Sequence, residues 1–262
     1  MDEKQGIQEE EKIYGTRWNV FHGGYFSDPT VAEPLLEAIT HAIAQSNPST
    51  IVDIGGGTGY LLGELSKRNF CSKIHFVNLD LSPLQLFAIP NPEITPIQKS
   101  ADQFERHQIM SNVDETLLCT MRSVIHYFGL DGQLPFLQRL RFQMKPREFF
   151  IHQSACFETE TNTSIINQLY SLMGTNKWFP TVDGMDRMLS QAGWIVHHHH
   201  LSPSLLLLSS ELAERYGLSE EDIYTIRRSI YHSHPVDSEV LTPTPEGFQA
   251  YLDYRIFICS AG

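Results

Sequence analysis

One segment of the chain combines a short apolar run, an acid and a loop of glycines: Ile51-Val52-Asp53-Ile54-Gly55-Gly56-Gly57-Thr58-Gly59-Tyr60-Leu61. The apolar run predicts a β-strand, and the residues after the last glycine predict a helix. The loop between them is therefore a tight turn at a helix N-terminus. Glycine permits positive φ angles and the close approach of a ligand, and the unpaired N–H groups of a helix start favour nucleotide-like ligands.

Strands and helices alternate outward from this loop. The predicted strands are residues 50–54, 73–79, 94–98, 117–121, 149–151, 194–196 and 254–259. The predicted helices are residues 29–46, 60–67, 83–87, 134–144, 185–192 and 219–230. This alternation predicts an α/β fold, a three-layer sandwich around a seven-stranded, mostly parallel central sheet whose last strand is antiparallel.

A length of 262 residues suits a single domain. We assign residues 48–200 and 254–262 to the ligand-binding core, residues 1–47 to an N-terminal helical cap, and residues 201–253 to an insertion between strands six and seven. Extra segments over the carboxyl edge of such a sheet form substrate walls or lids. A homodimer contact or plain packing is the alternative role of the insertion.

Two patterns mark the insertion. Ser219-Glu220-Glu221-Asp222 is typical of a capping box, with isoleucines on one face of the helix that follows. Thr242-Pro243-Thr244-Pro245 predicts a rigid, extended break.

Composition narrows the class of partner. The chain has 31 acidic residues against 19 lysines and arginines, a formal net charge of −12. Nucleic-acid surfaces need clustered basic residues, so we expect no nucleic-acid partner. Residues 1–12 lack the basic start and apolar run of a signal peptide, and the leucine run 205–208 is too short to span a membrane. We therefore expect a cytoplasmic protein with no membrane partner.

Cysteine and histidine give no metal signal. The cysteines form no C-x-x-C pair and predict buried, reduced thiols. They are Cys71, Cys119, Cys156 and Cys259. The run His197-His198-His199-His200 continues the predicted strand 194–196, and no Cys, Asp or Glu flanks it. A metal site needs converging ligands, so we expect none.

The spacing of the loop glycines is Gly55-x-Gly57-x-Gly59, with Asp53 two residues before the first. A dinucleotide fingerprint has the spacing G-x-G-x-x-G, which this loop does not match. The pattern resembles the D-x-G-x-G-x-G motif of class I S-adenosylmethionine-dependent methyltransferases. Asp80, at the end of the second strand, and residues 100–104, 114–128 and 188–194 extend the resemblance, which covers about residues 48–200 and the terminal strand.

The resemblance implies a site for S-adenosylmethionine, which would leave as S-adenosylhomocysteine. The glycine loop and the first acid would lie at its amino-acid end and ribose, and the second acid would accept from the ribose hydroxyls. Residues 100–104 would hold the adenine, and residues at the end of the fourth strand, within 114–128, would border the methyl group. The implied cofactor-binding residues are Asp53, Gly55, Gly57, Gly59, Asp80, Leu81, Asp102, Gln103 and Thr120.

Each implied acid also has a structural alternative. Asp53 would cap the glycine turn, Asp80 would cap residues 82–87, and Asp102 would be the N-cap of a helix that runs through Glu105.

Methyl transfer is an in-line displacement in which alignment and desolvation carry much of the rate. A general base is needed only for an acceptor that is bound in its protonated form. His126 follows the fourth strand and is the candidate base; a structural role is its alternative. Residues that could line the substrate pocket, or simply pack, are Trp18, His22, Tyr25 and Tyr127.

The leading hypothesis is a methyltransferase that acts on a small-molecule acceptor. A protein-modifying methyltransferase and a non-catalytic cofactor-binding module of the same fold are alternatives. An NAD(P)-dependent oxidoreductase is disfavoured by the glycine spacing and by the lack of a Tyr-x-x-x-Lys pair. The sequence does not indicate whether O, N, C or S receives the methyl group.

Overall fold

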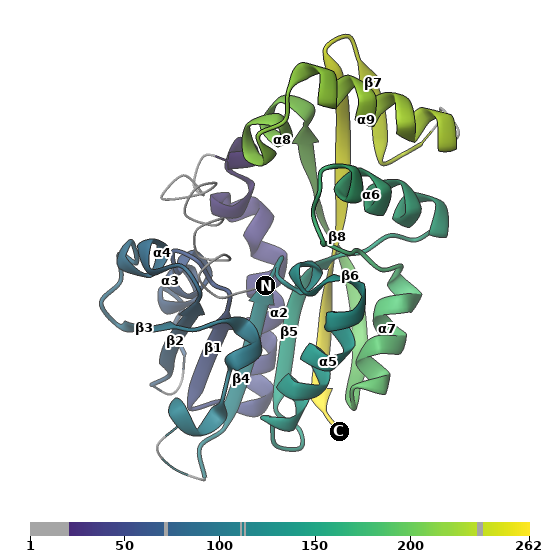
Figure 1. Cartoon of the computed structure of the whole chain (residues 1–262). Coiled ribbons are helices and arrows are strands. Elements are labelled where there is room, and N and C mark those ends of the chain that lie inside the picture. The colour runs from purple at the N-terminus through teal and green to yellow at the C-terminus, as the bar shows by residue number, and fades with distance from the viewer. Residues whose placement is uncertain (1–20, 71–72, 111, 113, 235–237) are drawn as a thin grey trace.

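The computed structural model describes residues 21–70, 73–110, 112, 114–234 and 238–262; Trp18, Cys71 and residues 1–12 lie outside the described residues. Within these ranges, eight strands form one sheet with the order β3-β2-β1-β4-β5-β8-β6, and β7 pairs with β8 (Figure 1). The strands are β1 (Thr50–Ile54), β2 (His75–Asp80), β3 (Ile94–Gln98), β4 (Leu117–Arg122), β5 (Phe149–Ala155), β6 (Trp194–Leu208), β7 (Leu241–Thr244) and β8 (Gly247–Ala261). The helices are α2 (Pro29–Ser46), α3 (Tyr60–Ser66), α4 (Pro83–Phe87), α5 (Gly129–Phe142), α6 (Glu160–Leu172), α7 (Val182–Gln191), α8 (Ser209–Tyr216) and α9 (Glu220–Ser233).

The strand directions confirm the predicted α/β fold. Strands β1 to β5 pair in parallel, whereas β8 is antiparallel to both β5 and β6. The predicted number of strands is wrong by one. Residues 242–245 were expected as an extended break, but they form β7 and enter the hairpin turn to β8. Pro243 is tolerated there because β7 is an edge strand, where a missing N–H breaks no ladder.

Strands β6 and β8 are much longer than the short apolar runs of sequence from which they were predicted. The expected strand 194–196 continues to Leu208, and the expected strand 254–259 begins at Gly247. Leu205 and Leu207 are buried while Leu206 is exposed, which is the two-residue period of a half-buried strand. The ends of segment 201–253 are therefore continuous with the sheet.

The far ends of β6 and β8 carry a second layer of helices, α6, α8 and α9 (top of Figure 1). The predicted capping box at Ser219 and Asp222 is confirmed, and Ile223, Ile226 and Ile230 of α9 are buried. These isoleucines belong to an apolar cluster that also includes residues of α6 and of β6.

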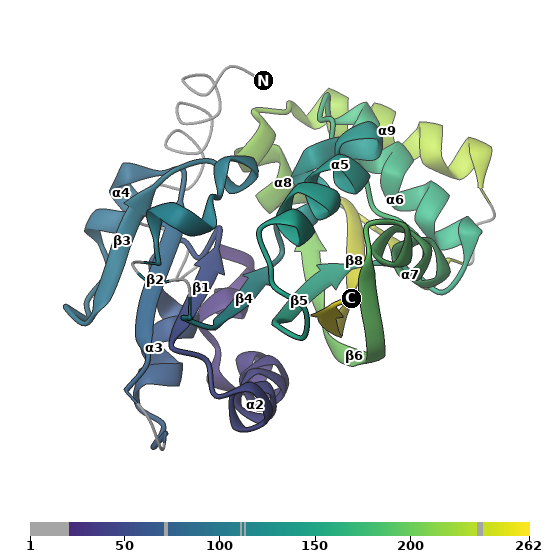
Figure 2. The ribbon, with the colours of Figure 1, turned by 90° about the horizontal axis from the view of Figure 1, so that it is seen from below.

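Helices cover both faces of the central sheet (Figure 2). Alternate residues of β1 point to opposite faces: Val52 and Ile54 pack with α5 and α7, and Ile51 packs with α2 and α3. A strand buried on both faces reads as a continuous apolar run, which is why β1 was visible in the sequence. No helix of the described ranges combines the length and the apolarity needed to cross a bilayer.

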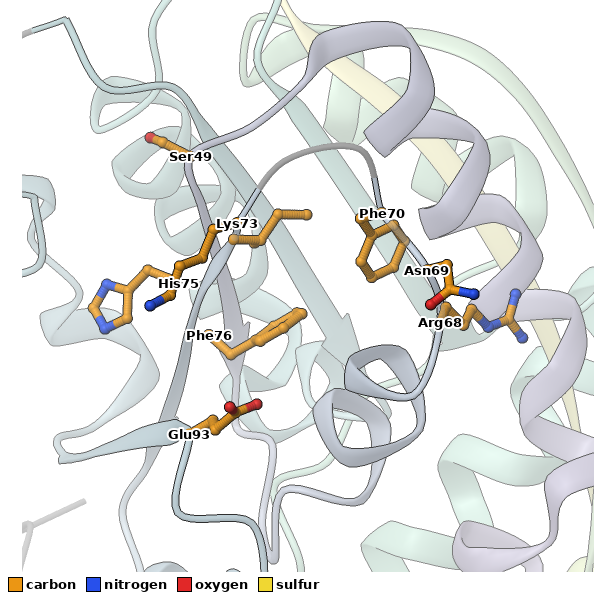
Figure 3. Close-up of a pocket in the computed structure, with 9 residues that line it drawn as sticks. Ser49, Arg68, Asn69, Phe70, Lys73, His75, Phe76 and Glu93 are labelled. Atoms are coloured by element: carbon orange, nitrogen blue, oxygen red, sulfur yellow. The ribbon is translucent and has the colours of Figure 1, made fainter.

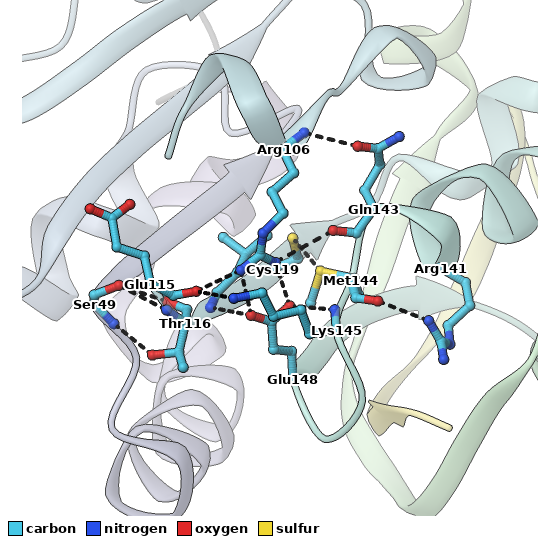
Figure 4. A network of polar contacts seen from close by, with 11 residues as sticks. Ser49, Arg106, Glu115, Thr116, Cys119, Arg141, Gln143, Met144, Lys145 and Glu148 are labelled. Carbon is cyan, nitrogen blue, oxygen red and sulfur yellow. Dashed lines mark hydrogen bonds and ion pairs between the residues drawn. The ribbon is translucent and has the colours of Figure 1, made fainter. Parts of the chain in front are cut away.

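A buried ion pair ties the amino ends of β4 and β5 together (Figure 4). Arg106 donates to both carboxylate oxygens of Glu148, at 2.6 and 2.8 Å. Glu148 also accepts from the backbone N–H groups of Leu117 and Lys145, and Arg106 donates to the carbonyl of Glu115. The bidentate geometry satisfies both charges away from water.

We expect Glu148→Gln to lower the free energy of unfolding by about 3 kcal/mol, because it leaves the largely buried Arg106 charge, 16% exposed, without its carboxylate. Urea denaturation measures this difference. The exposed pair Lys67–Glu64, whose lysine side chain is 70% exposed, is the matched control. Glu64→Gln should change the stability by less than about 1 kcal/mol. Equal effects of the two substitutions would contradict a stabilising role for the Arg106–Glu148 pair.

Candidate functional site

The glycine loop lies between β1 and α3, at the carboxyl edge of the sheet. Gly55, Gly57 and Gly59 have φ angles of 73°, 56° and 72°. A side chain at these positions would be strained, so the glycine spacing follows from the backbone path.

Gly56 must be glycine for a different reason: neighbouring side chains leave no space for a Cβ atom at this position. A Cβ at this position would lie 2.1 Å from Asn78 Oδ1 and 2.5 Å from Asp53 Oδ2. Asn78 Nδ2 donates to the carbonyl of Gly57 at 2.9 Å. The loop therefore rests directly on the side chains of β1 and β2.

Three polar residues form a row across the sheet beneath this loop. Asn78 of β2, Asp53 of β1 and Thr120 of β4 are register partners. Among the described residues, nothing hydrogen-bonds to the buried atoms Asn78 Oδ1, Asp53 Oδ1 and Thr120 Oγ1. Buried polar atoms are normally satisfied, and the glycine loop covers this row, so a ligand that brings hydrogen-bond donors would reach these atoms only if the loop moves. The ammonium and hydroxyl groups of S-adenosylmethionine are donors of this kind.

The carboxyl group of Asp53 is buried and carries an altered pKa. Burial, and then the negative charge of Asp80, raises the pKa of Asp53 to about 7, while the positive charge of Arg122 opposes this. A cationic ligand group nearby would favour the ionised form.

Asp80 holds the loop from the other side. Its Oδ2 accepts from Gly57 N at 2.8 Å, and its Oδ1 accepts from Ser82 N at 2.9 Å. The alternative in which Asp80 caps residues 82–87 is wrong, because Ser82 is the N-cap of α4 and its hydroxyl accepts from Gln85 N; each Asp80 oxygen keeps a further lone pair. Burial raises the pKa of Asp80, while the backbone N–H groups of Ser82 and Gly57 lower it.

The segment after β3 reaches the same edge, because Lys99 N donates to the carbonyl of Asp80 at 2.9 Å. Asp102 and Gln103 are exposed and lie in a single 3-10 turn, Ala101–Gln103. The alternative that made Asp102 the N-cap of a helix through Glu105 is wrong, because Ser100 precedes this turn and no longer helix forms. Leu81 follows β2 and is half-buried.

A small pocket lies beyond the end of β4, where the N-terminal 3-10 segment Phe21–Ser27 meets the second layer of helices. The described residues that enclose it include His22, Ser123, His126, Tyr127, Lys177 and Tyr254. Its free space is about 20 Å³. Three predicted pocket or base residues, His22, His126 and Tyr127, thus come together.

Tyr25 is not among the described residues that line the pocket. Its hydroxyl donates to the carbonyl of Pro203 at 2.5 Å, and its ring stacks on Tyr254 with centroids 5.7 Å apart. Tyr25 therefore joins the N-terminal segment to β6 and β8.

The two histidines of the pocket differ in their surroundings. His126 stacks on Tyr127 and Phe179, with ring centroids 4.5 and 5.0 Å apart. Burial, followed by the charge of Lys177, lowers the pKa of His126 well below its usual value. Burial also lowers the pKa of His22, whose Nδ1 donates to Glu211 at 3.1 Å.

Arg122 was missed by sequence reasoning. Its guanidinium donates to Gln153 Oε1 at 2.8 Å and to the carbonyl of Phe26 at 3.0 Å, and it lies 5.3 Å from the ring centroid of Phe26. These contacts fasten the N-terminal segment to β4 and β5. The sequence signal that could have identified Arg122 is its position as the one charged residue at the end of the apolar strand β4.

An open cavity of about 690 Å³ lies at the opposite edge of the sheet (Figure 3). Lys73 and His75 at the start of β2 line it, with Arg68 and Phe70 after α3. Open α/β sheets bind ligands at the carboxyl ends of their strands, so this cavity is separate from the candidate site.

The histidine run lies on β6. His199 Nε2 is 3.5 Å from Asp186 Oδ2. In the part of the chain that the structure describes, no three His, Cys, Asp or Glu side chains gather as a metal site would require. The described cysteines, Cys119, Cys156 and Cys259, are buried free thiols.

Comparison with known proteins agrees with this geometry. The sequence profile of a family described as a methyltransferase domain matches residues 30–199. No curated protein sequence matches the chain.

Solved structures share the fold at low identity. The YcgJ protein from Bacillus subtilis has a TM-score of 0.64 and 11% identity, covering 87% of this chain and 98% of its own. A putative methyltransferase from Bacillus halodurans has a TM-score of 0.61 and 13% identity, with the same coverage of each chain. A putative sarcosine dimethylglycine methyltransferase from Galdieria sulphuraria has a TM-score of 0.54 and 12% identity, covering 87% of this chain and 84% of its own.

The buried carboxyl of Asp53 should make stability depend on pH. Its pKa is about 7 in the folded chain against an ordinary 3.8. The stability contribution is therefore complete below the ordinary pKa and is lost as the pH rises to the folded value. Relative to Asp53→Asn, the wild type should lose up to about 4 kcal/mol of unfolding free energy between about pH 4 and pH 8.

Urea denaturation over this pH range measures the difference. The exposed acid Asp114 is the control, because Asp114→Asn should give a difference that hardly changes with pH. A pH-independent difference for Asp53→Asn would show that its carboxyl titrates normally in the folded chain.

Proposed function

The chain belongs to the family of methyltransferase domains, and from this membership we propose that it transfers a methyl group from S-adenosylmethionine to a small-molecule acceptor. The observation that carries the proposal is the glycine loop itself, which has the family's spacing, adopts positive φ at Gly55, Gly57 and Gly59, and is held at the carboxyl edge of the sheet by Asp80.

The residues at this edge fit the proposed cofactor. When bound, S-adenosylmethionine supplies a methyl group on a positively charged sulfur. In the proposal Gly55, Gly57 and Gly59 line its amino-acid end, and Asp53 offers an acceptor to its ammonium. Asp80 uses its remaining lone pairs for the ribose hydroxyls.

The remaining contacts of the proposed site extend outward from Asp80. Leu81, Asp102 and Gln103 lie beside the adenine, and Thr120 lies on the path toward the acceptor. These residues follow or end strands β2, β3 and β4. The parallel register of β3, β2, β1 and β4 brings the carboxyl ends of these strands to one edge of the sheet.

An enclosed pocket supports a small acceptor. The pocket at His22 and His126 is lined by the N-terminal segment and by Arg215 of α8, and its free space of about 20 Å³ suits a small molecule better than a folded protein. The net charge of −12 argues against nucleic acid. One structural neighbour is described by its name as acting on sarcosine and dimethylglycine, which are small molecules.

The chain's own residues would align and desolvate the reactants. Burial of the pocket excludes water, which strengthens polar contacts within it. His126 is the candidate that removes a proton from a hydroxyl acceptor, since it forms part of the pocket wall.

Calorimetry tests the cofactor. We expect saturable binding of S-adenosylmethionine and S-adenosylhomocysteine and none of NAD. Asp80→Ala should weaken binding by about 1–3 kcal/mol, because charge-assisted hydrogen bonds are lost. Asp114→Ala, at an exposed acid on the opposite edge, should bind as the wild type does. Saturable binding of NAD alone would overturn the proposed function, and unchanged affinity in folded Asp80→Ala would refute its ribose contact.

Release of S-adenosylhomocysteine with a panel of phenols, alcohols and amines tests His126. His126→Phe keeps the ring stacked on Phe179 but removes both nitrogens. If His126 is the base, turnover of hydroxyl acceptors should fall by about a hundredfold or more while cofactor affinity is retained. Exposed His75, at the amino end of β2, is the control, and His75→Phe should keep its activity. An active His126→Phe protein would limit His126 to a packing role.

A further inference from the structure

Lys177 places a positive charge at the wall of the enclosed pocket. Its Nζ lies 4.2 Å from the ring centroid of Tyr127 and 5.6 Å from those of Tyr170 and Tyr216. It also donates to the hydroxyl of Tyr216 at 3.0 Å. All of these partners are neutral.

A second cation borders the same tyrosine. Arg215 donates to the hydroxyl of Tyr127 at 3.1 Å and is itself buried. Tyr127 thus lies between two basic side chains. The described residues that enclose the pocket include neither aspartate nor glutamate.

Glu211 contacts a residue of the pocket wall, and its Oε2 accepts from His22. Lys177 makes no ion pair within the described ranges. A partly buried cation with neutral partners is an attractive site for an anion, because ion pairing offsets its desolvation.

The charge of Lys177 is felt on both sides of the pocket. After burial, which is the larger cause, it lowers the pKa of His126, and it also lowers that of His22. The local positive charge is opposite in sign to the net charge of −12 of the whole chain. A cleft with this charge concentrates anions locally.

We propose that this pocket binds an anionic acceptor, a small molecule with a carboxylate that pairs with Lys177. The inference rests on the proposed function for the statement that the bound molecule is the methyl acceptor. It adds the chemical class of that molecule.

Binding requires a local rearrangement. The free space of about 20 Å³ is close to that of one water, so a carboxylate must displace side chains. Tyr127 is 39% exposed and marks the side of entry. On binding, the ammonium group of Lys177 would leave its contact with the ring of Tyr127 and pair with the carboxylate of the ligand.

A cationic acceptor is the competing occupant, since tyrosine rings also bind ammonium groups. It would have to replace Lys177, which is tethered among the rings, and would then face Arg215. The two cations, Lys177 and Arg215, therefore favour an anion.

Three probes of one shape separate the two cases: benzoate, neutral benzamide and cationic benzylammonium. Their dissociation constants are measured by calorimetry on the full chain, with and without S-adenosylhomocysteine. We expect benzoate to bind about ten- to a hundredfold more tightly than benzamide, the strength of a charge-assisted contact. Benzylammonium should bind most weakly.

Lys177→Gln should abolish the preference for benzoate, and Lys177→Arg should keep it. Lys67→Gln, at an exposed lysine far from the pocket, is the matched control. If Lys177→Gln does not fold, salt dependence in the wild type serves instead, because added sodium chloride should weaken benzoate binding and leave benzamide unaffected.

Equal binding of benzoate and benzamide, tightest binding of benzylammonium, or a preference that survives in Lys177→Gln would each overturn the proposal. The outcome is separable from that of the proposed function. A preference for benzoate without binding of S-adenosylhomocysteine would leave an anion pocket but reject the methyltransferase. Binding of S-adenosylhomocysteine without that preference would reject the anionic acceptor alone.

Discussion

The contact of Gly56 with the side chains of Asn78 and Asp53 fixes the carboxyl edge of the sheet. A Cβ would lie 2.1 Å from Asn78 Oδ1, so only glycine lets the loop close on this row. Asp80 then holds Gly57 from the other side and, through Ser82, sets the start of α4. The path of the loop and the entry to α3 thus depend on one layer of buried polar side chains.

Charge divides this edge into two areas. The acids Asp53 and Asp80 lie under the glycine loop, where a cationic methyl donor is proposed. The cations Arg122 and Lys177 lie toward the pocket, where an anionic acceptor is proposed. Arg122 stands between them: it opposes the rise in the pKa of Asp53 and fastens the N-terminal segment through Phe26. In the proposal, the acidic area would attract the cationic methyl donor and the basic area would attract the anionic acceptor. Each reactant would thus be oriented by its own set of residues.

The fold could be predicted from the sequence where the signal is local. The apolar run of β1, the glycine spacing and the capping box of α9 each lie within a few residues. Helix α6 and strand β7 were not predicted, because α6 is identified by its packing on α9 and β7 contains prolines that argue against a strand. The end of β6 was misjudged because leucines 205–208 fit a strand or a helix equally well. Lys177 and Arg215 could not be assigned to a site, since tertiary packing alone brings them to Tyr127.

The length of β6 and β8 limits how this molecule can move. Each has 15 residues, and they pair from Trp194 and Ala261 to Leu208 and Gln249. At about 3.3 Å per residue, each spans roughly 50 Å, so the main-chain ladder runs from the core through the second layer, with register shifts between Val196 and His198 and between Ser202 and Leu205. The second layer cannot swing away as a rigid body while this ladder is intact. The segment Phe21–Ser27, in contrast, is held over the pocket by side chains such as Arg122 and Glu211. Exchange with solvent is therefore a local opening at the amino-terminal side, with a lower barrier than cooperative disruption of the sheet.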